Sequence, residues 1–195
     1  MRWFALFITL LCANALLANL PLRDCTLSVS ASGVPVPQER LKPYLRGNLV
    51  VLNARGFIFE PPAAKSIKAE PTDDISTPFR TAINYHRAIR TQGPEEIARY
   101  WHPSYRKQMQ AYFSRPEILS GAKEKLSATD NIDSMGMLEL DNRAVMYVRY
   151  GGRTQAFVCV KVGDEYLLVN DPGTKTLNQI ACAAFDSGRV EMASN

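Results

Sequence analysis

The spacing of apolar residues divides the second half of the chain into a helical part followed by a strand part. Five positions recur at helical spacing between residues 78 and 92: Phe79, Ala82, Ile83, His86 and Ile89. This spacing predicts an amphipathic helix with one buried face, capped by Thr77 and ended by Gly93. Three further helices are predicted, each beginning with a proline, which fits the first helical turn. They cover residues 94–101, 103–114 and 116–126.

From residue 131 the apolar pattern changes to a period of two, which is typical of half-buried strands. Strands are predicted over residues 132–140, 143–150, 154–162 and 165–170. The dipeptides between them, Asp141-Asn142, Gly151-Gly152 and Gly163-Asp164, favour tight hairpins, so the four strands should form an antiparallel meander. Residues 77–173 are therefore predicted to be an α+β domain, with three or four helices packed on a curved four-stranded sheet. Residues 174–195 are expected to be a C-terminal tail.

Residues 19–76 form a proline-rich segment that holds seven of the twelve prolines in the chain. This density excludes long helices and favours short extended pieces. Residues 27–30 alternate as a strand does, and residues 49–52 and 57–59 are predicted to form a hairpin around Asn53–Gly56. Residues 60–76 have the composition of a linker.

The first 18 residues have the composition of a signal peptide. Residues 3–13 are apolar except for Thr9, and Ala13-Asn14-Ala15 offers the small residues that a signal peptidase reads. We expect cleavage after Ala15 or Ala18 and a periplasmic or secreted protein. The apolar stretch is shorter than the roughly 20 residues needed to cross a bilayer, and no later segment is a membrane candidate.

Charge is distributed unevenly between the two halves of the predicted domain. Residues 77–126 hold nine Lys or Arg against four Asp or Glu, whereas residues 127–195 hold six against nine. A basic helical half indicates an acidic partner or an anionic envelope, although ordinary scatter on solvated faces gives the same count. The candidate contact residues are Arg87, Arg90, Arg99, Arg106 and Lys107. Nucleic acid is excluded as a partner, because the charge is modest and no recognition motif is present.

Three cysteines follow the signal: Cys25, Cys159 and Cys182. An oxidising compartment favours one disulfide, and Cys159 with Cys182 is the pair closest in sequence. The alternative is that all three are buried, inert thiols. The chain has only two histidines and no zinc, phosphate-loop or calcium motif, so no metal site and no cofactor are expected.

The helical segment TPFRTAINYHRAIRTQGPEEIARYWHPSYRKQM, followed by strands that end RTQAFVCVKVGDEYLLVND, resembles the nuclear-transport-factor-2-like (SnoaL-like) superfamily over residues 77–172. The resemblance implies a cone-shaped fold with a pocket between helix and sheet. Because this superfamily includes enzymes, ligand binders and interaction modules, it does not select a function.

His86 is the candidate catalytic residue, because it lies on the apolar face of the first predicted helix and could act as a general base. Tyr147 or Asp133 could orient it. The alternative is a core histidine bonded to a backbone carbonyl.

These observations leave two candidate functions. The first is an exported, non-catalytic binding module for a protein partner or an envelope component, of inhibitor or immunity type. The second is an enzyme or carrier that takes a small apolar ligand in the cone.

Overall fold

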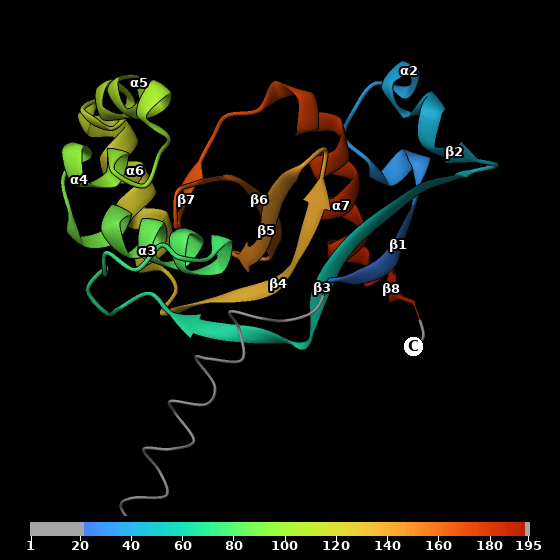
Figure 1. Cartoon of the computed structure of the whole chain (residues 1–195), viewed down its shortest axis with the longest axis horizontal. Coiled ribbons are helices and arrows are strands. Elements are labelled where there is room, and N and C mark those ends of the chain that lie inside the picture. Colours follow the sequence, from blue (N-terminus) through green and yellow to red (C-terminus); the bar gives the residue numbers. More distant parts are fainter. Residues whose placement is uncertain (1–21, 194–195) are drawn as a thin grey trace, which may run out of the picture.

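The computed structural model describes residues 22–193, so the predicted signal peptide lies outside the described residues. Its centre is an eight-stranded antiparallel sheet with the order β7-β6-β5-β4-β3-β1-β8, and β2 pairs with β3 beside this path (Figure 1). The strands are β1 (Arg23–Ser30), β2 (Leu45–Arg46), β3 (Leu49–Ser66), β4 (Asn131–Leu140), β5 (Arg143–Tyr150), β6 (Arg153–Val162), β7 (Glu165–Leu168) and β8 (Val190–Met192).

The predicted fold class is wrong, because the sheet is twice as large as the expected four-stranded meander. β4 to β7 do pair in sequence through three hairpins. β1, β2 and β3 from the proline-rich segment, and β8 from the expected tail, extend the same sheet. The α+β character remains, but the helices α3 to α6 are inserted between β3 and β4 instead of preceding the sheet.

The long strand β3 joins the two halves of the sheet, and it replaces the predicted hairpin at Asn53–Gly56. Residues 49–56 pair with β1, and β3 also pairs with β4 between Arg55 and Ser66, with a register shift between Ile58 and Ala63. In the sequence Gly56 favours a turn. In the structure the absence of a side chain at Gly56 allows β3 to lie close to β4. A Cβ there would clash with the Met137 carbonyl. The turn preference of these residues is overridden by pairing with strands on both sides.

The predicted helices lie where their prolines indicated. They are α3 (Pro78–Thr91), α4 (Pro94–Ala98), α5 (Pro103–Phe113) and α6 (Pro116–Ser127). The Thr77 hydroxyl accepts from the backbone N–H of Arg80 at 3.1 Å, which confirms the predicted N-cap. A short helix α2 (Gln38–Leu41) and a long helix α7 (Lys175–Ser187) were not predicted. No helix within residues 22–193 has the length and apolar character of a membrane span.

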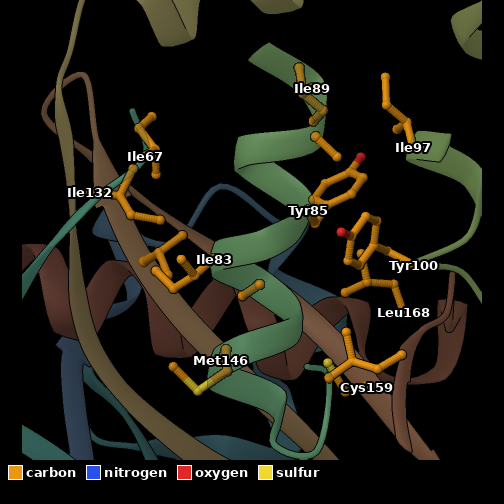
Figure 2. Packing of buried hydrophobic residues seen from close by; sticks show 14 of the residues in the cluster. Ile67, Ile83, Tyr85, Ile89, Ile97, Tyr100, Ile132, Met146, Cys159 and Leu168 are labelled. Atoms are coloured by element: carbon orange, nitrogen blue, oxygen red, sulfur yellow. The ribbon is translucent and has the colours of Figure 1, made fainter. Parts of the chain in front are cut away.

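Two hydrophobic clusters pack on opposite faces of the sheet. α3 covers one face, and Figure 2 shows Tyr85 and Tyr100 on one side of α3 and Ile83 on the other, with Met146 and Cys159 close to its lower turns. α7 covers the other face with Ile180, Ala181, Ala184 and Phe185.

The predicted Cys159–Cys182 disulfide is wrong, and both residues are free thiols. Cys159 belongs to the cluster on the α3 face, whereas Cys182 packs from α7 against the cluster on the other face. The sheet therefore separates the two sulfur atoms. Nearness in sequence could not show this separation, because successive side chains of a strand point to opposite faces of the sheet.

Candidate binding cleft

A cleft of about 900 Å³ lies between α5, the edge of β6 and α7. One wall comes from α5 with Gln108, Met109, Tyr112 and Phe113. The other comes from α7 with Lys175, Asn178, Gln179 and Cys182. Residues 154–158 of β6 lie between the two walls. Tyr85, Trp101 and the residues 168–172, which lead from β7 towards α7, complete the lining.

Aromatic rings fill the α3 side of this cleft. Tyr85 is at the centre, with ring centroids 5.9 Å from Trp101, 6.0 Å from Phe157 and 6.5 Å from Phe113, all edge to face. Such pairs are favourable beyond the burial of their area and hold the rings in fixed orientations. Tyr112 lies at the rim and is 42% exposed. The cleft therefore offers a preformed surface for a flat or branched apolar group.

The Trp101 indole N–H is a buried donor in this lining. It approaches Tyr85, yet no acceptor within residues 22–193 meets hydrogen-bond geometry. Burial raises the pKa of Tyr85, so its hydroxyl is protonated at neutral pH. A buried donor without a partner costs about 1–3 kcal/mol.

Charged groups near the cleft are largely occupied by the protein itself. Asp171 accepts from Arg143 Nε at 3.0 Å and from the Gly173 backbone N–H at 2.9 Å. Asp186, at the C-terminal end of α7, accepts from the backbone N–H and the hydroxyl of Thr154 at 3.1 and 2.6 Å. The bonds of Asp186 fix the end of α7 against β6, and those of Asp171 join β5 to the start of the segment before α7.

The thiols near the cleft are not activated as nucleophiles. Burial, with Asp186 nearby, raises the pKa of Cys182 to about 12. Burial also raises the pKa values of Cys159 and Cys25. Because the thiolate is the reactive form, all three are inert at neutral pH.

His86 lies beside this cleft in a smaller depression of about 430 Å³ between α3, α6 and the β5–β6 strands. The side chain is 1% exposed, its Nδ1 is 2.6 Å from the Ala82 carbonyl oxygen, and Phe157 packs against the ring. Burial lowers the pKa of His86 to about 4. The ring is therefore neutral at pH 7 and is a weak base.

The residues expected to orient His86 lie on the other face of the sheet. Tyr147 donates to the Asn178 side-chain oxygen on α7 at 3.3 Å. Asp133 is paired across strands with Arg149, whose guanidinium donates to the carbonyl of Phe185 on α7 at 2.7 Å. The geometry does not bring either residue to the imidazole.

Four of the five candidate contact cations bond to other groups of the protein. Arg87 donates to the Ser66 carbonyl, and Arg90 donates to the carbonyls of Leu126 and Thr129. Arg99 pairs with Asp73 at 3.1 Å, and Arg106 donates to the Trp101 carbonyl at 3.0 Å. Lys107 is exposed on α5. Four of the five therefore hold neighbouring segments in place.

The residues that line the cleft were missed because they come from distant parts of the chain. The wall from α7 lies within residues 174–195, which were expected to be a C-terminal tail. Comparison of the chain with protein-family models, curated proteins and solved structures gives no match. The resemblance to the nuclear-transport-factor-2-like superfamily stays a prediction.

Proposed function

We propose that this protein is an exported, non-catalytic binding module that holds an apolar group of its partner in the cleft between α5 and α7. The observation that carries the proposal is the lining. Ordered aromatic rings, with Tyr85 packed edge to face against Trp101, Phe113 and Phe157, line a space of about 900 Å³. Such a surface recognises an apolar group.

The same lining argues against the enzyme alternative. Its carboxylate Asp171 is held by Arg143 and Gly173, its thiol Cys182 is protonated, and His86 lies in the neighbouring depression. General acid–base or nucleophilic catalysis needs a group with a pKa near the working pH and a partner to orient it. These residues support binding better than turnover.

Fluorescence tests the proposal directly, because residues 19–195 contain a single tryptophan, Trp101. The apolar dye 8-anilinonaphthalene-1-sulfonate is titrated into the folded protein, and energy transfer from Trp101 to the dye is recorded. We expect saturable transfer that Tyr112→Asp weakens at least about tenfold, since a rim charge opposes an apolar guest.

Val162→Asp is the matched control. Val162 is 41% exposed, close to the 42% of Tyr112, but it lies at the far end of β6. This variant should bind the dye like the wild type. Equal weakening by both substitutions, or no saturable transfer in the wild type, would contradict a binding role for the cleft.

A further inference from the structure

The outer edge of β6 is only half covered. β7 pairs with residues 159–162, from Cys159 opposite Leu168 to Val162 opposite Glu165. The outer edge of β7 is itself covered, because Leu168 exchanges backbone hydrogen bonds with Tyr100 and His102 at 2.8 and 2.9 Å. Past Leu168 the Val169 N–H still donates to the Val158 carbonyl, and residues 169–172 line the cleft on the way to α7. No strand pairs with β6 before Cys159 on that side.

The register shows which backbone groups face this open edge. Tyr150 and Arg153 close the two-residue hairpin, so the odd-numbered residues of β6 bond to β5 and the even-numbered ones point outward. Two outward groups confirm this: the Val158 carbonyl accepts from the Val169 N–H at 3.0 Å, and the Thr154 N–H donates to Asp186.

Four outward backbone groups have no hydrogen-bond partner among residues 22–193. They are the Thr154 carbonyl, the Ala156 N–H and carbonyl, and the Val158 N–H. All three residues line the cleft. Residues 154–158 span about 16 Å at the usual rise of a strand. A row of unpaired backbone groups along a cleft is a template for another extended backbone.

We propose that the occupant of the cleft is an extended peptide segment of a partner protein, which adds to β6 as a further strand. This inference rests on the proposed function and names the class of ligand. The unpaired backbone donors and acceptors supply the affinity, as in other cases of strand addition, and the walls supply the selection of side chains.

The two walls set the side-chain preference. Alternate residues of an added strand point to opposite faces. On the α3 face they would meet Tyr85, Trp101 and Phe157, which accept a large apolar side chain. On the other face they would meet Asn178 and Gln179 of α7, which accept a polar or small one.

The walls also favour a lone segment over a second copy of this chain. α5 and α7 line the cleft on both sides of the open edge, so an incoming strand must fit between two helices. The β6 edge of a second copy carries the same two helices beside it, and these would meet the helices of the first. Only a strand without its own flanking layers reaches Ala156.

Peptide selection followed by backbone methylation tests the inference. A random library of short linear peptides is selected on the folded protein, and the tightest peptide is synthesised with N-methyl groups on alternate residues, in two registers. Methylation removes a donor and blocks pairing on one edge only. We expect one register to lose at least about tenfold in affinity and the other to bind like the parent.

Ala156→Pro is the matching change in the protein. It removes one outward N–H and leaves the bonds to β5, and proline is tolerated on such edges. We expect at least about tenfold weaker peptide binding, whereas Ala156→Val, which keeps the N–H, should bind within about threefold of the wild type. Circular dichroism shows whether each variant is folded. The methylated peptides test the idea even if the proline variant is not.

Each other outcome overturns the inference. Equal binding of both methylated registers would exclude strand addition. A dimer in sedimentation that Ala156→Pro abolishes would identify a second copy as the occupant. Dye binding without any selected peptide would refute the peptide and leave the proposed function standing, whereas failure of dye and peptide together would refute both.

Discussion

Acidification should destabilise the protein through His86. The imidazole is fully buried, and this burial lowers its pKa from 6.5 to about 4. Between these values the unfolded chain binds a proton that the folded chain does not, so stability falls as the pH falls from 6.5 towards 4. From pH 7 to pH 5 the loss attributable to this residue is about 2 kcal/mol, and it approaches about 3 kcal/mol below pH 4.

Urea unfolding at pH 7 and pH 5 measures this loss of stability in the wild type and in two variants, His86→Leu and His102→Asn. His86→Leu removes the titrating group, and its unfolding free energy should change about 2 kcal/mol less between the two pH values than that of the wild type. The chain has one other histidine, His102, which caps α5 by accepting from the Ser104 N–H. His102→Asn keeps a cap and should retain the full wild-type change.

For each protein the change in unfolding free energy between pH 7 and pH 5 is compared with that of the other two. Effects common to all three proteins, such as carboxyl titration, then cancel. If His86→Leu loses as much stability on acidification as the wild type, the imidazole is not a buried neutral group. The core position assigned to it would then be wrong. A full loss of pH dependence in His102→Asn would refute the assignment equally.

Three further predictions concern packing and thiol chemistry. Asp186→Ala should lower the free energy of unfolding in urea by about 1–3 kcal/mol, because Thr154 loses its acceptor. The control Asp164→Ala lies in an exposed hairpin turn and should change this free energy by less than about 0.5 kcal/mol. Equal effects of the two substitutions would contradict the hydrogen bonds between Asp186 and Thr154. Gly136→Ala should cost about 1–3 kcal/mol in thermal unfolding, since a Cβ would lie 2.5 Å from the Phe57 carbonyl oxygen; an unchanged melting temperature would contradict the close approach of β3 and β4. Ellman's reagent at pH 8 should react with Cys25, Cys159 and Cys182 only after the protein is unfolded, because burial raises the pKa values of these thiols. Rapid reaction of the folded protein, or fewer than three reactive thiols after unfolding, would refute this prediction.

Local signals in the sequence were sufficient for the central part of the chain. The prolines at the starts of α3 to α6 and the Gly and Asp pairs between β4 and β7 act within a few residues of themselves. Their positions therefore follow from the sequence without knowledge of distant contacts.

The larger sheet could not be predicted in the same way. β1 pairs with β3 and with β8, and the latter joins residues near the two ends of the described chain. Asn53–Gly56 carries turn residues, yet tertiary pairing makes it part of a strand. The candidate site depends on this assembly, because Trp101, Phe157 and Cys182 meet only when α5, β6 and α7 are in place.

The indole N–H resonance of Trp101 is the most direct test of the cleft as a binding site. Residues 19–195 give one such signal in a ¹⁵N-labelled protein, because Trp101 is their only tryptophan. On titration with 8-anilinonaphthalene-1-sulfonate, the signal should move in the wild type and in Val162→Asp, and should stay in place in Tyr112→Asp over the same concentrations. If dye binding moves other resonances while the indole signal remains fixed in the wild type, the ligand binds elsewhere and the account of the cleft is wrong.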